Sequence, residues 1–304
     1  MYIGFLTSCL PTVSLDEKIE WAKNHGFKAL EVAVWPREND RDYSSSDIDV
    51  ENLTQEEADA IMTKVRDAGL EITSLAYYDN NLHRDPETRA FINRHTMKAI
   101  DAAAMMGVDS VGTFVGRNID KTIEENFPEF QEVFSKIVGY AEEKGVKLII
   151  ENCPMDDWQV PGQPGTISFT PELWDEMFRL VPNKNFGLNF DPSHLYYQLI
   201  DYNALIKKYA DRIFHVHAKD AELFEDRLAV VGIRDAYLGK ESYWRYRMPG
   251  LGKVDMKGMV EALREIGYDG VISIEHEDLL YEGTNEKVYE GLELGLSYLK
   301  TFVH

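Results

Sequence analysis

Two kinds of segment alternate along the chain. Short runs of apolar, β-branched and aromatic residues predict strands, and longer runs with apolar residues at helical spacing predict amphipathic helices. The strand pattern occurs at residues 2–8, 29–34, 71–78, 110–116, 147–153, 185–191, 212–219 and 270–277. The helical pattern occurs at residues 15–26, 54–69, 86–107, 123–145, 170–182, 202–211, 255–270 and 285–302. Several of these helical segments close with glycine, a common helix stop signal.

The alternation of strands and helices predicts an α/β fold, a closed (β/α)8 TIM barrel. We expect one TIM-barrel domain over residues 1–304, because α/β barrels often reach this length as a single domain. Two connections are longer than ordinary ones, and we expect long loops there, at residues 152–170 and 220–254, after the fifth and seventh strands. Their aromatic residues, such as Trp158 and Trp244, could shape a substrate site or pack together as a lid or an oligomer contact.

Four of the predicted strands end in residues that bind hard metal ions. These residues are Glu151, Asp191, His217 and Glu275. Because active sites of such barrels lie at the carboxyl ends of the strands, we expect the four side chains to meet there. Three carboxylates and one imidazole, with no thiolate, favour one divalent metal ion, with Mn²⁺ ahead of Mg²⁺, Co²⁺ or Zn²⁺. The alternative is that each acid is buried in a separate ion pair.

Alternate residues of a barrel strand face inward, so the sequence also predicts what lies around the site. In the second strand, Glu31 and Trp35 face the barrel axis, with Trp35 at the mouth. In the seventh strand, both His215 and His217 face inward, with His217 nearer the open end. His215 and Asn189 lie one layer lower and are candidates for supporting the site from below.

The chain is strongly acidic, with 53 acidic against 32 basic residues and a formal charge of -21. This charge disfavours binding to nucleic-acid phosphates and to anionic membrane surfaces. No apolar run approaches the ~20 residues needed to cross a bilayer. The two cysteines are too few for a disulfide framework, and the first residues lack the features of a secretory signal. We therefore expect a cytoplasmic protein that binds a small molecule and neither nucleic acid nor membrane; the sequence leaves homo-oligomer formation open.

A metal held by these residues could bind adjacent oxygens of a sugar and stabilise the enediolate that forms when a neighbouring carbon loses its proton. Epimerisation needs a base on one face of the substrate and an acid on the other. Glu151 and Glu275 come from the fifth and eighth strands and could flank the substrate in these two roles. We therefore expect a divalent-metal-dependent isomerase or epimerase that acts on a sugar or sugar derivative.

Five segments at these strand ends carry a resemblance to a known family. The segments ENC, NFDPSH, HVHAKD, RMPGLG and ISIEHE, in this order, resemble the sugar phosphate isomerase/epimerase family of xylose isomerase-like TIM barrels. The resemblance covers essentially the whole chain. It implies that the four strand-end residues bind one divalent metal and that Glu151 and Glu275 form the acid/base pair. The long segment between His217 and Pro249 departs from the short loop usual in ketohexose epimerases of this group.

The resemblance also implies that His194 contacts a substrate oxygen and that Arg247 binds substrate or helps to close a loop. From the residues alone, His194 could instead cap the helix that follows Pro192. Lys219 is a further substrate-binding candidate, since it would face inward beyond His217, although a pair with Asp220 explains it equally well.

Two aromatic residues at strand ends, Trp35 and Tyr78, are also candidates for substrate binding. They could form the floor of a sugar site, or they could simply plug the barrel mouth.

Other functions fit parts of the same pattern. The same enolate would lead to elimination if the substrate carried a suitable leaving group, so a lyase or dehydratase on a keto-sugar, an inosose or a 3-oxo-glycoside is an alternative. A non-catalytic sugar-binding or scaffold subunit would be expected to lack one of the four strand-end residues. Endonuclease IV shares the barrel but needs histidines at early strand ends, where this chain has Trp35, Tyr78 and Gly116.

Overall fold

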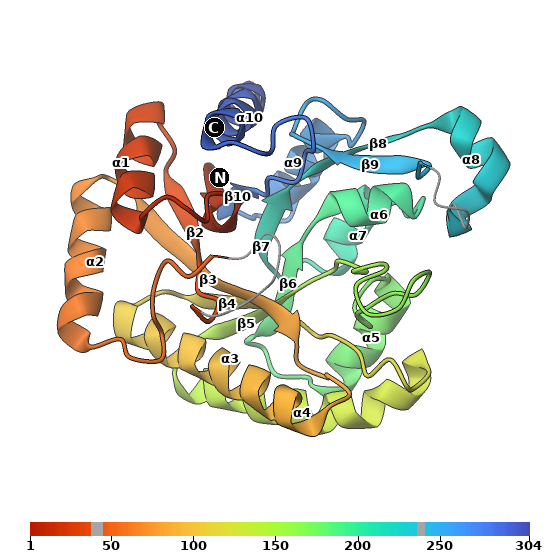
Figure 1. Cartoon of the computed structure of the whole chain (residues 1–304), viewed down its shortest axis with the longest axis horizontal. Coiled ribbons are helices and arrows are strands. Elements are labelled where there is room, and N and C mark those ends of the chain that lie inside the picture. Colours follow the sequence, from red (N-terminus) through yellow and green to blue (C-terminus); the bar gives the residue numbers. More distant parts are fainter. Residues whose placement is uncertain (38–44, 236–240) are drawn as a thin grey trace.

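A closed barrel of parallel strands forms the centre of the molecule, as the sequence predicts. The computed structural model describes residues 1–37, 45–235 and 241–304. The strands follow one another around the barrel in the order β1-β10-β7-β6-β5-β4-β3-β2 (Figure 1). They are β1 (Tyr2–Leu6), β2 (Ala29–Ala33), β3 (Glu71–Asn80), β4 (Ser110–Phe114), β5 (Lys147–Glu151), β6 (Phe186–Phe190), β7 (Ile213–Ala218) and β10 (Val271–Ile274).

Helices connect successive strands and surround the barrel (Figure 1). Each segment with the helical pattern contains one, and helices begin at capping residues such as Ser14, which forms a capping box with Glu17. Gly26 follows the first helix with φ +83°, a conformation that glycine adopts without strain. The helices are α1 (Leu15–His25), α2 (Gln55–Asp67), α3 (Pro86–Met106), α4 (Ile123–Glu143), α5 (Pro171–Leu180), α6 (Pro192–Tyr197), α7 (Tyr202–Lys208), α9 (Met256–Glu265) and α10 (Asn285–Leu299), with a 3-10 turn, η1, at Thr7–Cys9.

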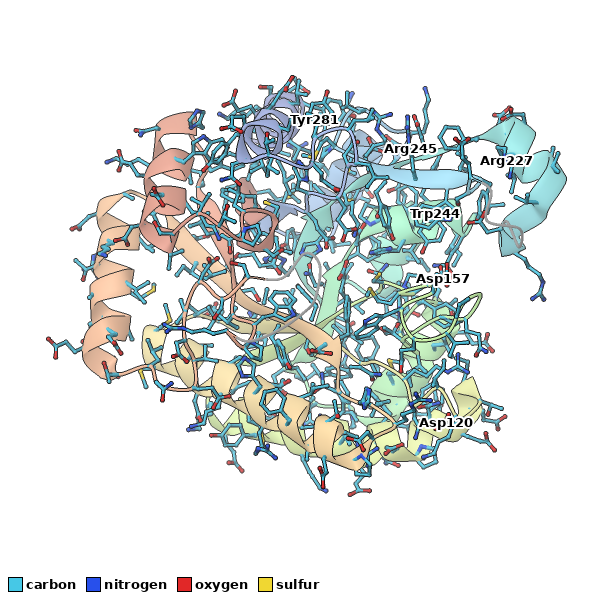
Figure 2. All side chains as sticks on the ribbon, viewed as in Figure 1. Asp120, Asp157, Arg227, Trp244, Arg245 and Tyr281 are labelled. Carbon is cyan, nitrogen blue, oxygen red and sulfur yellow. The ribbon has the colours of Figure 1, made fainter. Side chains whose placement is uncertain are left out.

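The segment after the seventh barrel strand folds as a hairpin and not as the expected loop. Strand β8 (Asp220–Leu223) pairs antiparallel with β9 (Trp244–Arg247). A short helix, α8 (Glu225–Val231), and a 3-10 turn, η2 (Gly232–Arg234), lie between the two strands in sequence. We call residues 220–235 and 241–247 the arm. It extends sideways from the barrel with α8 at its far end (Figure 1), and Trp244, Arg245 and Arg227 lie along it (Figure 2).

The other long connection, residues 152–170, contains no helix or strand and is a loop as expected. Two of its residues, Met155 and Asp157, have positive φ angles of 51° and 63°. Such angles are uncommon for residues other than glycine and are frequent near functional sites. Among the described residues, no helix is both long and apolar enough to cross a membrane.

Candidate metal centre

The four strand-end residues share one buried site at the carboxyl end of the barrel. Glu151 ends β5, Asp191 follows β6, His217 lies near the end of β7 and Glu275 follows β10. One potential ligand atom from each lies within 4.8 Å of the others, and all four residues are buried. Parallel strands bring together residues that are far apart in the sequence, because their carboxyl ends all meet on one face of the barrel.

Local hydrogen bonds fix two of these residues. Asp191 caps α6, since its Oδ1 accepts a hydrogen bond from the Ser193 backbone N–H at 2.7 Å. The Asn152 side chain binds both backbone groups of Asp191, donating to its carbonyl oxygen and accepting from its N–H, each at 2.8 Å. This double contact ties the end of β5 to the end of β6. Glu151 is therefore held in a fixed position relative to Asp191.

Three atoms of the site are buried without a hydrogen bond to any described residue. They are Asp191 Oδ2, His217 Nδ1 and Glu275 Oε2. His217 Nδ1 lies 2.9 Å from Glu275 Oε2, but at angles that make no hydrogen bond. Buried polar atoms are usually satisfied, since leaving one unpaired costs free energy. Three of the four clustered residues therefore each offer a buried ligand atom that fits coordination of a cation.

The ammonium group of Lys219 lies among the same carboxylates. Its Nζ is 2.7 Å from Glu275 Oε2, 3.1 Å from Glu277 Oε2 and 3.3 Å from Asp191 Oδ2. The Tyr246 ring covers it, with the nitrogen 4.5 Å from the ring centroid. Lys219 does not need Asp220 as its partner, because the Asp220 carboxylate accepts four hydrogen bonds from backbone N–H groups. The sequence pattern predicts Lys219 near the site but gives no indication of Glu277.

The charges of the site balance one another. Burial opposes the ionisation of Glu151, but Lys219 and the neighbouring histidines outweigh it and hold its pKa well below the usual range. Burial raises the pKa of Asp191 and raises that of Glu277 to about 7. Against its own burial, Lys219 has a raised pKa because Glu275 and Glu277 face it. The site therefore combines ionised carboxylates with one buried ammonium group.

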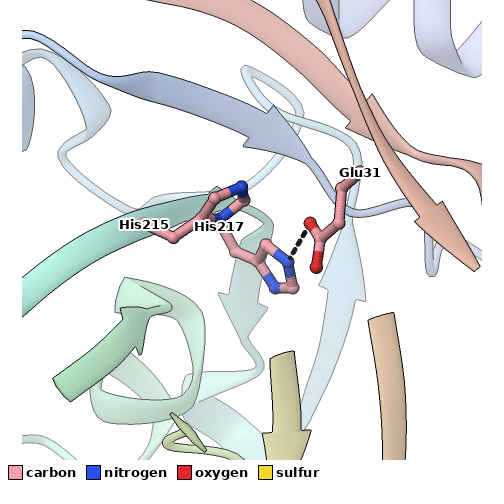
Figure 3. A group of neighbouring side chains, drawn as sticks. All are labelled: Glu31, His215 and His217. Carbon is pink, nitrogen blue, oxygen red and sulfur yellow. Dashed lines mark hydrogen bonds and ion pairs between the residues drawn. The ribbon is translucent and has the colours of Figure 1, made fainter. Parts of the chain in front are cut away.

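A second layer of side chains lies directly beneath this site. Glu31 Oε2 lies 2.8 Å from His217 Nε2, as Figure 3 shows, and it also accepts a hydrogen bond from Ser273 at 3.0 Å. Burial opposes the ionisation of Glu31, but His217 and His215 lower its pKa to about 2. Burial lowers the pKa of His215 to about 4. The sequence pattern placed Glu31 inside the barrel but gave no reason to assign it to the site.

His194 also lies in the site and does not cap α6. Its Nε2 is 3.0 Å from Glu151 Oε1 and 3.4 Å from Asp191 Oδ2. Its Nδ1 is 2.9 Å from the hydroxyl of Tyr246, which comes from the arm. Trp244 of the arm stacks on Tyr197 with ring centroids 3.8 Å apart. The aromatic residues of the arm therefore pack beside the barrel mouth and contact α6.

Arg247 is engaged in ion pairs that hold the arm in place. Its Nε lies 2.9 Å from Asp278 Oδ2 and its Nη1 lies 3.1 Å from Glu222 Oε2. Asp278 Oδ2 also accepts a hydrogen bond from the Met248 backbone N–H. The family resemblance implies that Arg247 either binds substrate or helps to close a loop, and these contacts agree with the second role. Arg247 does not belong to the group of four metal-ligating residues.

Trp35 and Tyr78 line a small cavity together with Glu151 and Glu275. The cavity has a volume of ≈ 80 Å³. Tyr78 donates to Glu31 Oε1 at 2.5 Å and accepts from Asn189 Nδ2 at 2.6 Å, so its hydroxyl belongs to the lower layer. Trp35 Nε1 has no hydrogen-bond partner among the described residues. Within the described parts of the chain, the indole N–H of Trp35, which lines this cavity, is thus available to donate to a ligand.

A larger hollow of ≈ 450 Å³ lies on the same face of the barrel, beyond a wall of aromatic side chains. Trp158 and Tyr77 line it, and each contacts an aromatic residue of the small cavity. The Trp158 ring packs edge-on against Phe114 at 6.0 Å, and the Tyr77 ring packs in the same way against Trp35 at 6.0 Å. Substrate groups too large for the small cavity would extend in this direction.

The family model of the xylose isomerase-like TIM barrel matches residues 19–298 of the chain. The chain belongs to this family. The resemblance that the strand-end motifs carry is thereby confirmed, and the barrel is the fold that this family shares.

The chain is similar in sequence to inosose dehydratases and in fold to an epimerase. An inosose dehydratase of Clostridium perfringens is 27% identical over 202 residues, which cover 63% of this chain and 61% of that protein. The chain thus spans about three fifths of the length of this relative. The D-psicose 3-epimerase of Clostridium cellulolyticum H10, solved with D-tagatose, has a TM-score of 0.71 at 15% identity, with both chains covered fully. The IOLI protein, solved with a zinc atom, has a TM-score of 0.72 at 20% identity over 99% of each chain. At these identities the two solved structures show a shared fold.

Proposed function

We propose that the chain is a divalent-metal-dependent enzyme that removes a proton from a carbohydrate or carbohydrate derivative. The observation that supports this most directly is the buried group of Glu151, Asp191, His217 and Glu275, three atoms of which have no hydrogen-bond partner among the described residues. A divalent cation would satisfy all three at once. The activities in the names of the inosose dehydratase and D-psicose 3-epimerase agree with this reading.

The donor set fits a hard or borderline divalent ion, because it consists of three carboxylates and one imidazole without a thiolate. When bound, such an ion would stabilise negative charge that develops on substrate oxygens. We expect Mn²⁺ first. Zn²⁺ is also a candidate, since the IOLI structure contains a zinc atom.

The two glutamates are our candidates for moving the proton. They come from β5 and β10, which are separated around the barrel by β6 and β7. Both line the small cavity, so a substrate there would lie between them. The pKa of each is lowered despite burial, by Lys219 and the histidines. Each is therefore ionised near neutrality and can accept a proton.

Lys219 and His194 are our candidates for orienting the substrate. The Lys219 ammonium lies among the carboxylates and can donate to a substrate oxygen. His194 has one ring nitrogen toward Glu151 and the other toward the Tyr246 hydroxyl, which fixes its ring plane. Trp35 offers its indole N–H from the cavity wall.

The outcome after proton removal is either isomerisation or elimination. An isomerase or epimerase returns the proton, whereas a lyase expels a group from the adjacent carbon. The inosose dehydratase relatives favour the second outcome as strongly as the D-psicose 3-epimerase favours the first. The substrate would then be a ketose for the first reading and an inosose, keto-sugar or 3-oxo-glycoside for the second.

Proton exchange in heavy water tests both readings. The protein loaded with Mn²⁺ is incubated in D₂O with a panel of ketohexoses and inososes, and products are followed by NMR. Deuterium in an isomerised or epimerised sugar supports the first reading, and a dehydrated or cleaved product supports the second. Removal of the metal with a chelator should stop either reaction. A protein that binds a sugar of the panel but exchanges no proton would be a non-catalytic binding subunit, and the proposal would then be wrong.

A further inference from the structure

Glu31 lies beneath the candidate metal centre, on the far side of the His217 ring from Glu275. Its carboxylate oxygen Oε2 is 2.8 Å from His217 Nε2 (Figure 3). At the other edge of the ring, His217 Nδ1 is 2.9 Å from Glu275 Oε2. Both Glu31 and His217 have no exposed surface. The imidazole therefore has a carboxylate on each edge.

We propose that Glu31 is a positioning residue that holds the Nε2–H of His217 and thereby directs Nδ1 to the metal. The inference rests on the proposed function, because it requires a metal at the four-residue site. A carboxylate on the distal N–H of a histidine ligand fixes the tautomer and the ring plane, and it makes the ligating nitrogen more basic.

The hydrogen bonds around Glu31 indicate which ring nitrogens of His215 and His217 carry a proton. His215 Nδ1 lies 2.9 Å from Asn189 Oδ1, which can only accept, so His215 carries its proton there. Its Nε2 then accepts from Thr73 Oγ1 at 3.1 Å. Asn189 Nδ2 donates to the Tyr78 hydroxyl, and Tyr78 in turn donates to Glu31 Oε1. The same Asn189 Nδ2 also lies 2.8 Å from His217 Nε2, the nitrogen that faces Glu31 Oε2.

The other oxygen of Glu31 completes the assignment. Oε2 accepts from Ser273 Oγ at 3.0 Å and lies 2.8 Å from His217 Nε2. A carboxylate that receives donors from Tyr78 and Ser273 can also receive the N–H of His217 but would repel a ring nitrogen lone pair. His217 Nε2 thus faces both the Glu31 carboxylate and the amide nitrogen of Asn189, each at 2.8 Å. The charged carboxylate is the stronger partner, so we assign the proton to Nε2, which leaves Nδ1 available to a metal.

Glu31, His215 and His217 lie close enough together to suggest a second metal site of their own. Their hydrogen bonds argue against it. Both nitrogens of His215 are used, one by Asn189 and one by Thr73, and both oxygens of Glu31 accept donors from neighbouring side chains. The lower group is thus a support for the upper site.

Metal binding by a charge-neutral variant tests the inference. We expect Glu31→Gln to bind Mn²⁺ about 10–100-fold more weakly than the wild type in a calorimetric titration. Tyr78→Phe removes a different hydrogen bond to Glu31 and leaves the carboxylate on His217, so it is the matched control and should lose much less affinity. Thermal unfolding of both variants shows whether they remain folded.

The tautomer of His217 gives a second readout that needs no substitution at Glu31. In the wild-type protein loaded with diamagnetic Zn²⁺, nitrogen-15 NMR should show a proton on His217 Nε2 and none on Nδ1. The resonance is assigned by its loss in His217→Gln.

The outcomes separate this inference from the proposed function. Wild-type affinity in folded Glu31→Gln, or a proton on Nδ1 in the loaded protein, would overturn the role of Glu31 alone. A wild-type protein that binds neither metal would overturn the inference together with the proposed function.

Discussion

The Lys219 ammonium nitrogen lies 2.7 Å from Glu275 Oε2, at the centre of the carboxylates that we assign to a metal. It is also 3.8 Å from Glu151 Oε1 and 3.3 Å from Asp191 Oδ2. The only nearby acid outside the metal-ligand set is Glu277, among the described ion pairs of Lys219. A lysine and a dication therefore compete for the same oxygens, and a bound metal would leave Glu277 as the main partner of Lys219.

Removal of this positive charge should strengthen metal binding. We expect Lys219→Met to bind Mn²⁺ about tenfold more tightly, because two cations a few ångströms apart repel each other even at the high effective dielectric of a protein site. The same variant should lose turnover, since the ammonium that orients the substrate is gone. Calorimetry and steady-state kinetics measure the two effects. Weaker Mn²⁺ binding by folded Lys219→Met would show that the lysine supports the metal and does not compete with it.

Each proposed acid/base glutamate should be essential for proton transfer. We expect Glu151→Gln and Glu275→Gln to lower the rate of deuterium exchange by about 10²–10⁴-fold, the usual contribution of general acid–base catalysis. Substrate binding should remain measurable in both, because the amide keeps an oxygen but cannot accept a proton. Glu143→Gln, an exposed position at the end of α4, is the control. Near wild-type exchange in either site variant would exclude the two-glutamate scheme.

Trp158 should affect substrate affinity more than chemistry. Its ring forms part of the wall between the small cavity and the larger hollow. We expect Trp158→Ala to raise KM by up to about tenfold for a substrate that reaches the hollow, with kcat nearly unchanged, because an aromatic contact contributes about 0.5–1.5 kcal/mol. Phe91 lines the larger hollow and not the small cavity. The variant Phe91→Ala therefore tests separately whether the substrate reaches the hollow. If both variants keep the wild-type KM, the substrate does not extend beyond the small cavity.

Stability should fall between about pH 6.5 and pH 4. Burial lowers the pKa of His276 to about 4, and neither ring nitrogen has a hydrogen-bond partner among the described residues. The folded state favours the neutral ring. The contribution of neutral His276 to the free energy of unfolding is therefore fully present above the unfolded pKa of about 6.5, and it is lost as the pH falls from there through the folded pKa of about 4. The loss from one such histidine is about 3 kcal/mol.

The substitution His276→Leu isolates this effect. Because His215 has a pKa lowered in the same direction, the wild type should lose stability through both residues and the variant through one. Chemical denaturation at pH 7.5 and pH 4.5 measures the difference. An equal loss in the variant and the wild type would mean that His276 does not stay neutral in the fold.

The barrel and the upper site were predictable from the sequence because each rests on a local pattern. Apolar strand runs and helix stop signals predict the alternation of strands and helices. Four metal-ligating residues at the ends of consecutive barrel strands predict that their side chains meet at one site. The neighbours of these residues were less predictable. Glu31 faces inward like Trp35. Its contact with His217 arises only because closure of the barrel places β2 across the interior from β7, and the sequence does not show this.

The arm was not predictable because its signal is weak. Strands β8 and β9 have only four paired positions each, and a helix separates them in place of a tight turn. A hairpin with short strands and a long connection lacks the turn residues by which hairpins are read from sequence. Likewise, the pairing of Arg247 with Asp278 depends on where the arm returns to the barrel.

The most direct test of the account is the location of metal in crystals soaked with MnCl₂, measured by anomalous diffraction at the manganese edge. We expect one ion per chain, bonded to Glu151, Asp191, His217 through Nδ1, and Glu275, with Lys219 moved toward Glu277. A site without anomalous signal in a crystal that contains ample Mn²⁺, or an ion bound instead between Glu31 and His215, would contradict it.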